Sequence, residues 1–350
     1  MTDALGNAHP KLAARLRKRL IASLPTPVSE HVVNLPIGQR RVLIKHDDIT
    51  SSIYGGNKVR KLEYLLQRAK DRNAKRIATF GTVGSNHALA TAIHARQAGL
   101  DCTCFLAHQT QTPYVPKVLG AHLRLGTELI KWGGGVDRLA QYRRYVQGRG
   151  TWVIPLGGSC WLGAVGFVNA GLELAAQIES GETDKPDRIY IANGTLGSVA
   201  GLAVGLALAS IQTEIHAVRV AYNRLSQPQN LQKLIHKTAQ LLHRYDATIP
   251  AHIGAHSKVI WRDEFYADGY AVADKATHEA VAAGKRYFDL ELETTYTGKA
   301  MAALLHDLGA GSDSATYMFW NTYNSKPLPE LPSSESWQNL PKQFQRYMSD

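Results

Sequence analysis

Short apolar runs alternate with longer amphipathic stretches along most of this chain of 350 residues. Strand-like runs lie at 40–46, 76–80, 101–107, 151–156, 188–193 and 214–222, and helix-like stretches lie between them at 58–73, 87–99, 164–180 and 199–211. Strands that alternate with helices pair in parallel, with helices on both faces of the sheet. The sequence therefore predicts an α/β fold with open, mainly parallel, twisted sheets.

The length and the net charge of the chain indicate how many domains to expect and which partners it could bind. A chain of 350 residues exceeds what one compact core usually organises, so we expect two domains. The net charge of +11 would attract anions. The Lys and Arg residues are dispersed, however, and no nucleic-acid-binding motif is present. We therefore expect no nucleic-acid partner.

Three cysteines, Cys102, Cys104 and Cys160, have neither a disulfide nor a zinc spacing. No HExxH or similar metal motif occurs, so we expect no metal. The cysteines fit a reducing cytoplasm. We also find no apolar run long enough to span a membrane and no signal-peptide core. Residues 11–24 form a basic amphipathic pattern, which favours a surface helix packed through Leu12, Leu16 and Leu20 over a transit peptide.

The segment Asn193-Gly194-Thr195-Leu196-Gly197-Ser198 joins a strand to an apolar helix. The first N–H groups of a helix are unpaired and, with the helix dipole, form a site for an anion. The glycine spacing is that of neither a dinucleotide-binding loop nor a nucleoside-triphosphate loop. From the residues alone, a phosphate site and a tight turn without a ligand both remain open.

Two other loops also join a strand to the start of a helix and could bind an anion. Gly81 to His87 ends in Ser85, Asn86 and His87, which can cap the helix or bind a carboxylate. The segment 157–160, which contains Ser159, is similar. Three such joints indicate a small substrate with more than one anionic group.

Lys58 follows Gly55-Gly56-Asn57 at the start of a predicted helix. The positive end of the helix dipole disfavours a charged lysine there, and a lysine with a lowered pKa is a better nucleophile toward an aldehyde. A solvated surface lysine is the alternative.

Five stretches, in this order, resemble the D-cysteine desulfhydrase and 1-aminocyclopropane-1-carboxylate (ACC) deaminase family. They are IKHDDITSSIYGGNKVRKLEYLL from residue 44, GTVGSNHALATAIHARQAGL from 81, IPLGGSCWLGAVGFVNAGLEL from 154, NGTLGSVAGL from 193 and TTYTGKAMAALLHDLGAG from 294. This family is a branch of the tryptophan-synthase-like, fold type II pyridoxal 5'-phosphate (PLP) enzymes. The resemblance implies a PLP cofactor, a homodimer and two domains, a large PLP-binding domain of residues 1–55 and 165–350 and a small domain of residues 56–164.

The resemblance also implies roles for individual residues. Lys58 would carry the cofactor and move the substrate's α-proton, Asn57 would bond the cofactor's 3-hydroxyl, and Thr322 would meet its pyridine nitrogen. The loop that would hold the phosphate consists of Gly194, Thr195, Leu196, Gly197 and Ser198. The residues that would act on or bind the substrate are Ser85, Asn86, His87, Ser159, Tyr270 and Tyr296, of which Ser85 and the two tyrosines would be catalytic.

The expected activity is α,β-elimination on a small, D-cysteine-like amino acid, which gives a 2-oxo acid and ammonia. Thr297 and His87 stand where ring-opening ACC deaminases have Glu and Gln, so they favour the desulfhydrase side. Departures from the family pattern at Cys160, Ala271 and the pair Tyr323-Asn324 lie around the expected substrate end. ACC deamination and a non-catalytic homologue that binds PLP or an amino acid are therefore the alternatives.

Overall fold

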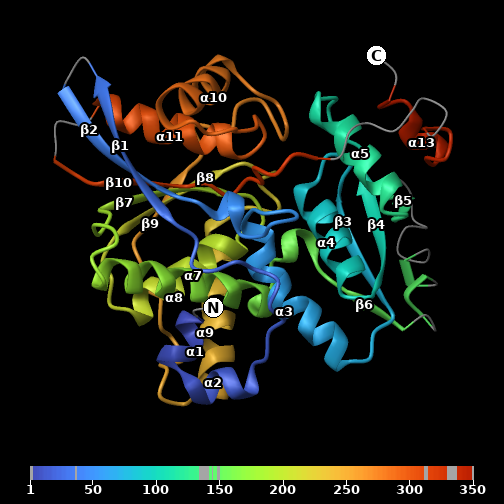
Figure 1. Cartoon of the computed structure of the whole chain (residues 1–350), viewed down its shortest axis with the longest axis horizontal. Helices are drawn as coiled ribbons and strands as arrows, with labels where there is room; N and C mark the ends of the chain where they lie inside the picture. The colour runs from blue at the N-terminus through green and yellow to red at the C-terminus, as the bar shows by residue number, and fades with distance from the viewer. Residues whose placement is uncertain are drawn as a thin grey trace. The chain divides into compact units, whose positions relative to one another are not determined.

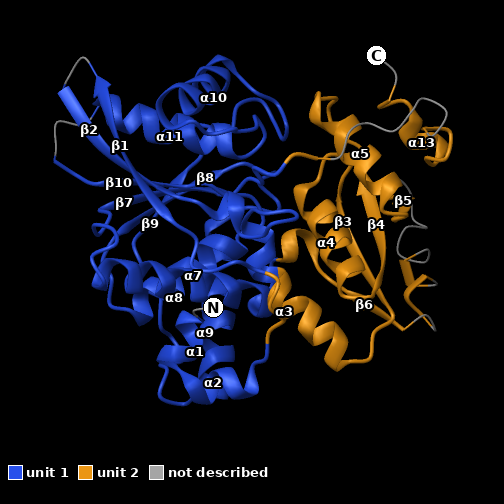
Figure 2. Cartoon of the chain, in the orientation of Figure 1, with its two compact units in different colours: residues 1–17, 22–61, 159–326 blue, residues 18–21, 62–158, 327–350 orange. Residues whose placement is uncertain are grey.

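The computed structural model describes residues 3–35, 38–133, 142–143, 145–147, 150–310, 314–328 and 337–348. The chain divides into two compact units (Figure 2). The first unit comprises residues 1–17, 22–61 and 159–326, and the second comprises residues 18–21, 62–158 and 327–350. Each unit contains its own sheet.

The first unit is built on a six-stranded sheet (Figure 1). In spatial order its strands are β1 (Val28–Leu35), β2 (Gly38–Lys45), β10 (Tyr317–Trp320), β7 (Arg188–Asn193), β8 (Glu214–Arg219) and β9 (Val259–Arg262). The β1–β2 pair is antiparallel, and every other pairing is parallel. The carboxyl ends of β2, β7, β8 and β10 therefore meet at one edge, which is where open α/β sheets bind ligands.

Helices cover both faces of this sheet (Figure 1). One face packs against α10 (Lys275–Phe288) and α11 (Thr297–Ala310) through a core that includes Tyr190, Tyr317 and Phe319. The helices of the other face are α7 (Trp161–Glu179), α8 (Gly197–Leu208) and α9 (Pro228–Tyr245). The unit also contains the short helices α1 (Ala4–Ala8) and α2 (Pro10–Arg15) and the 3-10 turn η1 (Asp47–Ile49).

Helices α7 and α8 pack backbone to backbone. A Cβ atom on Gly201 would lie 2.1 Å from the carbonyl oxygen of Ala164, so glycine is required at this crossing. Phe167, on the next turn of α7, packs on Trp320 of β10 with 6.0 Å between ring centroids. These contacts hold α8, whose amino end lies at the carboxyl end of β7, against the sheet.

Among the helices of the described residues, α7 has the length and composition that could cross a membrane. The sequence analysis predicted a helix over most of this stretch, at 164–180, but found no apolar run long enough to span a membrane. However, 78% of the apolar window of α7 is buried inside the fold. A buried core helix meets the same criterion, so the helix is weak evidence for a membrane span.

The second unit contains four parallel strands, in the order β5 (Glu128–Lys131), β4 (Asp101–Ala107), β3 (Arg76–Thr82) and β6 (Thr151–Val153). The helices of its described residues include most of α3 (Asn57–Asp71), together with α4 (Asn86–Gln97), α5 (Tyr114–Arg124) and α13 (Lys342–Gln345), and the turn η2 is Leu156–Gly158. Phe105 and Phe80 stack at 5.3 Å in an aromatic core on this sheet. The mainly parallel α/β architecture predicted from the alternating pattern is confirmed.

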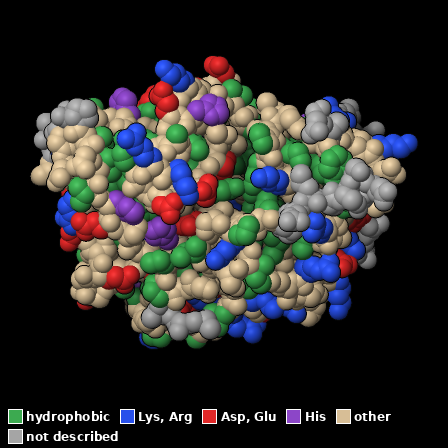
Figure 3. Space-filling view, turned by 45° about the horizontal axis from the view of Figure 1, so that its top comes forward, with side chains coloured by type: hydrophobic (Ala, Val, Ile, Leu, Met, Phe, Trp, Pro, Cys, Tyr) green, Lys and Arg blue, Asp and Glu red, His purple; other side chains and the backbone are tan. Residues whose placement is uncertain are grey.

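The distribution of basic side chains bears on the predicted absence of a nucleic-acid partner. On the face that Figure 3 shows, the Lys and Arg side chains are scattered, and several of them lie beside Asp or Glu. Arg41, for example, pairs with Glu30 and with Asp184, each at 2.7 Å. The absence of a nucleic-acid partner stays a prediction.

The boundaries of the units differ from the predicted 56–164. The division falls inside α3 (Asn57–Asp71), after Lys61, and again before Ser159. Residues 327–350 group with the small unit instead of the large one, because the hydroxyl of Tyr347 donates to the Gln109 carbonyl at 3.1 Å. Sequence patterns show where elements alternate but carry no signal for such a distant contact.

The helix predicted over residues 11–24 is wrong beyond Arg15, where α2 ends. Leu12 and Leu16 are buried as expected, but Leu20 is 62% exposed. The next residues instead bond to Glu63, whose carbonyl accepts the backbone N–H of Arg19 at 2.9 Å. Tertiary contacts have here overridden the local helical periodicity.

Candidate active site

The predicted phosphate loop connects β7 to α8 in the first unit. Leu196, the residue before the helix, has φ +74°, which is uncommon for a residue with a side chain. Such strain persists where the surroundings impose it, and it often marks a ligand site. Gly197 is the first residue of the helix, and the first N–H groups of a helix have no partners inside it, so this loop can offer donors to an anion.

Ser159 and Lys61 approach this loop from outside it. The Ser159 hydroxyl lies 2.6 Å from the Thr195 hydroxyl and accepts from Lys61 Nζ at 3.2 Å and from the Gly197 N–H at 3.3 Å. A Cβ on Gly197 would lie 2.6 Å from Ser159 Oγ and 3.0 Å from Lys61 Nζ. The glycine therefore leaves room for an ammonium, a hydroxyl and a helix N-terminus to converge.

Lys61 is 1% exposed, although its side chain is cationic at neutral pH in water. Burial lowers its pKa well below the ordinary value, and repulsion by the neighbouring Lys58 lowers it further. A bound dianion would remove that penalty, because an opposite charge favours the protonated amine. Lys61 could therefore neutralise a phosphate, and the sequence analysis did not single out this residue.

Asn57 connects this loop to the lysine that follows it in sequence. Its side-chain Nδ2 donates to Ser198 Oγ at 3.0 Å, and both residues are buried. Lys58 is the second residue of α3. Loss of hydration lowers the pKa of the Lys58 amine to about 8, so about a fifth of it is neutral near physiological pH, against about a thousandth for an ordinary lysine. A neutral amine beside an anion loop can form an imine with a phosphate-bearing aldehyde.

The segment after β10 holds the loop that precedes Lys58. The Asn57 N–H donates to the Thr322 carbonyl at 3.2 Å, and the Gly55 N–H donates to Asn324 Oδ1 at 2.7 Å. Gly56 has φ +90°, and a Cβ there would lie 2.9 Å from the Thr322 carbonyl oxygen. Asn324 thus has a structural partner, although it departs from the family pattern. The predicted contact of the Thr322 hydroxyl with a pyridine nitrogen stays a prediction.

A buried charge cluster fixes the first turn of α3; we call it the Arg60 cluster. Arg60 donates to Asp47 at 2.7 and 2.9 Å and to Glu173 of α7 at 2.9 and 3.0 Å. Lys45 Nζ donates to the same Glu173 at 2.7 Å. These four side chains are at most 3% exposed. Arg60 lies two residues after Lys58, so the cluster fixes the position and orientation of the helical turn that carries Lys58.

Tyr270 and Tyr296 lie together, as the resemblance implied. Their hydroxyls share a hydrogen bond, and their rings meet edge to face with centroids 6.0 Å apart. Tyr296 also lies beside the phosphate loop, since its Cε1 would be 4.0 Å from a Cβ on Gly194. Tyr222, which follows β8, stacks on Tyr270 at 5.6 Å. The sequence analysis missed Tyr222, because one tyrosine after a strand carries no distinctive signal.

Two charged residues, Glu293 and Lys299, hold the tyrosines in place. The Glu293 carboxylate accepts the N–H groups of Thr295, Tyr296 and Thr297, each at 2.8 Å, and so caps α11. Lys299, which is fully buried, donates to the carbonyls of Tyr266 and Gly269 in the loop before Tyr270. The hydroxyls of Tyr270 and Tyr296 are therefore held in fixed positions and can exchange a proton with each other.

Ser85, Asn86 and His87 belong to the second unit. Ser85 caps α4, since its hydroxyl accepts the Ala88 N–H at 3.2 Å. His87 is 4% exposed, and its Nε2 lies 2.9 Å from the hydroxyl of Thr79 on β3, so it does not face solvent. Asn86, the first residue of α4, is half-buried. Their proposed binding of a substrate carboxylate stays a prediction.

The residues of the first unit fit PLP. A partly neutral lysine, a helix N-terminus, a buried ammonium and converging hydroxyls are the groups that bind an aldehyde and a phosphate. The fold and this site define a lysine-dependent cofactor enzyme of the open α/β class. A family model described as pyridoxal-phosphate dependent enzyme matches residues 22–322. The chain belongs to this family, and PLP is its cofactor.

Solved structures support the same fold. An ACC deaminase homologue is 25% identical to this chain, with a TM-score of 0.73, and the match covers 92% of this chain and 95% of that one. A threonine deaminase from T.th. is 19% identical with a TM-score of 0.61, covering 92% and 99%. A fungal L-serine ammonia-lyase from Rhizomucor miehei is 18% identical with a TM-score of 0.56, covering 85% and 95%. The predicted type II fold of PLP enzymes is confirmed.

Substituting Lys61→Gln should weaken PLP binding to the cofactor-free protein by about ten- to a hundredfold, because a charge-assisted bond to phosphate contributes roughly 1.5–3 kcal/mol. Titration with PLP, followed by visible absorbance, measures the change. Lys70→Gln is the matched control, since Lys70 is an exposed residue of the same helix. Equal affinities for the two variants would remove Lys61 from the phosphate site.

The lowered pKa of Lys58 predicts how cofactor loading depends on pH. The neutral amine is the nucleophile, so the rate at which cofactor-free protein reacts with PLP should rise with pH and level off above about 8. Free Nα-acetyl-lysine, measured in parallel, corrects for titration of PLP itself and should keep gaining up to about pH 10.4. A protein rate that follows the free amine through pH 10 contradicts the buried environment.

Proposed function

We propose that this PLP enzyme removes a β-substituent and the amino group from a small, D-cysteine-like amino acid. The products are a 2-oxo acid, ammonia and the departed β-group, and water supplies the new oxygen. The observation that carries the proposal is the placement of Lys58, whose amine has a pKa of about 8 and which directly follows the residue bonded to Ser198. A lysine in that state can both hold an aldehyde and accept a proton.

The first unit supplies separate groups for anchoring and for proton transfer. PLP, when bound, withdraws electrons from the α-carbon of an amino acid joined to it. Lys61, Ser159, Thr195 and the Gly197 N–H would hold the phosphate. Asn57, fixed by its bond to Ser198, would orient the ring through the 3-hydroxyl. The anchored ring would then stay in place while protons move.

Lys58 is the group suited to take the α-proton, because its lowered pKa leaves far more of its amine neutral at physiological pH than in an ordinary lysine. The leaving group departs from the β-carbon with its bonding electrons and needs a proton. The Tyr270–Tyr296 pair carries hydroxyls that are already hydrogen-bonded to each other. One of them would donate that proton while the other replaces it, which is general acid catalysis by a positioned side chain.

ACC deamination is the second candidate, and the similarity to an ACC deaminase homologue favours it. The residue after Tyr296 argues against it. Thr297 brings no carboxylate to this position; its side chain is 1% exposed, and its hydroxyl accepts the Glu293 N–H at 3.1 Å. The hydroxyl is thus occupied in starting α11. Elimination from an open-chain amino acid suits this arrangement better than ring opening.

The activity is tested by loading the protein with PLP and screening D- and L-amino acids and ACC for release of a 2-oxo acid. D-Cysteine or a related β-substituted amino acid should give product, and ACC should give far less. Lys58→Ala should lose both the visible band of bound cofactor and turnover, whereas exposed Lys70→Ala should keep both.

Two results would contradict the proposal. ACC turnover above that of every open-chain amino acid would select the deaminase. A stable cofactor band without turnover on any amino acid would select a non-catalytic homologue.

A further inference from the structure

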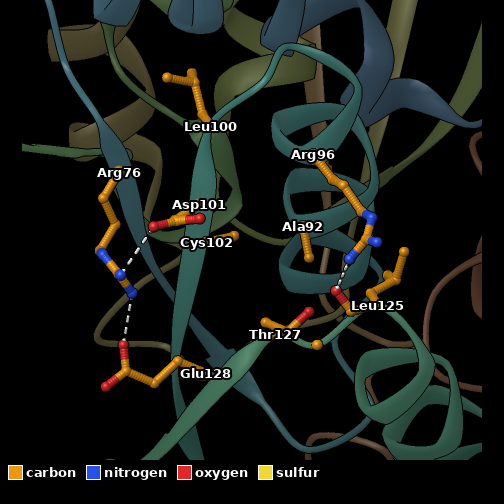
Figure 4. Close-up of a pocket in the computed structure, with 10 residues that line it drawn as sticks. Arg76, Ala92, Arg96, Leu100, Asp101, Cys102, Leu125, Thr127 and Glu128 are labelled. Carbon is orange, nitrogen blue, oxygen red and sulfur yellow. Dashed lines mark hydrogen bonds and ion pairs between the residues drawn. The ribbon is translucent and has the colours of Figure 1, made fainter.

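The second unit contains a cavity of about 170 Å³ at the amino ends of its strands (Figure 4). Arg76, Asp101 and Glu128, which line it, are the first residues of β3, β4 and β5. Ser85 and His87 follow the opposite, carboxyl end of β3, roughly 20 Å away for a strand of this length. The cavity is therefore separate from the edge at which open α/β sheets place their catalytic residues.

One wall of the cavity is acidic. Arg76 donates to Asp101 Oδ2 at 2.9 Å and to Glu128 Oε2 at 2.8 Å, so one guanidinium serves two carboxylates (Figure 4). Within the described part of the chain, Asp101 Oδ1 accepts no hydrogen bond. The Asp101 side chain is 70% exposed, which leaves that oxygen available to a ligand. This wall thus offers an acceptor for a positively charged donor.

The opposite wall carries Arg96 of α4 (Figure 4). Its Nη1 donates to the carbonyl of Leu125, the residue that ends α5. No carboxylate among residues 3–35, 38–133 and the other described segments forms an ion pair with Arg96. The guanidinium is held in place by a neutral group, so it keeps its full charge and its remaining donors for an anion.

Size and apolar lining limit what the cavity can hold. Between the walls lie Ala92, Leu100 and Cys102, of which Ala92 is 1% exposed. The volume is many times the roughly 10–15 Å³ required for one water, yet it is below the roughly 300 Å³ of a typical drug-sized pocket. A compact organic molecule with two charged ends fits these dimensions.

We propose that this cavity binds a small zwitterionic amino acid, with its carboxylate on Arg96 and its ammonium on Asp101. The two arginines and the two carboxylates of the lining balance in charge. An anion alone would face Asp101 and Glu128, and a cation alone would face Arg76 and Arg96. A dipolar molecule meets an opposite charge at each end.

A ligand bound to Arg96 is linked through helix α4 to other residues of the second unit. Arg96 lies near the end of α4, and Asn86 and His87 form its first turn. These residues are separated by about 15 Å along one helix. A ligand that shifts Arg96 would also shift Asn86 and His87, because all three residues belong to the same helix. The cavity therefore suits an amino acid that regulates the enzyme. Binding here does not depend on which reaction the enzyme catalyses.

Titration calorimetry of PLP-loaded protein with glycine tests the proposal. Glycine that enters the active centre changes the visible spectrum of the cofactor, whereas glycine in this cavity does not. We expect a spectrally silent binding component that Arg96→Gln and Asp101→Asn each weaken at least tenfold. Arg124→Gln, an exposed arginine of α5 outside the cavity, is the matched control and should keep it.

Acetate and methylamine, which carry one charge each, test the dipolar ligand directly and should bind the silent site at least tenfold more weakly than glycine. The proposal fails if the wild-type protein shows no silent component, or if the component has the same affinity in all variants. Binding of acetate or methylamine as tight as that of glycine would also overturn it.

Discussion

Arg60 lies buried between Asp47, which precedes α3, and Glu173 of α7, and it donates to both carboxylates. Buried charges are costly unless each is paired, and removing one partner of such a cluster destabilises a protein by roughly 3–5 kcal/mol. Lys45 on β2 completes the balance. These ion pairs therefore fix β2, the turn η1 and the helices α3 and α7 relative to one another. The turn of α3 that carries Lys58 is held in position by this arrangement.

The same helical turn explains the electrostatics of the site. Lys58 and Lys61 are three residues apart and lie on one side of α3, where their charges repel. The amino end of α8 and the hydroxyls of Ser159 and Thr195 lie beside Lys61. A phosphate dianion relieves this excess of positive charge, while burial lowers the pKa of the Lys58 amine and so raises its neutral share. We therefore propose that anchoring depends on Lys61 and reactivity on Lys58.

Alternating patterns in the sequence were enough to predict the parallel α/β fold, because each strand with its helix carries a local periodicity. The loop from Gly194 to Ser198 could be singled out from its motif as a candidate phosphate site, whereas its bond to Asn57 was not predicted. Lys61 was missed although it lies one helical turn after Lys58, because an apolar environment for a lysine cannot be read from neighbouring residues. Strand β10 was missed as well, since its four residues, Tyr317–Trp320, are all buried and show no alternation. The position of Tyr347 beside Gln109 depends on a contact between residues far apart in sequence.

We propose that Lys58, and not its buried neighbour Lys61, forms the covalent link to the cofactor. Reduction of the PLP-loaded protein with borohydride makes that link permanent, and peptide mass spectrometry then locates the phosphopyridoxyl group. We predict that the group is found on Lys58, with Lys61 unmodified. A modification on Lys61, or on any lysine outside the first turn of α3, would contradict the account.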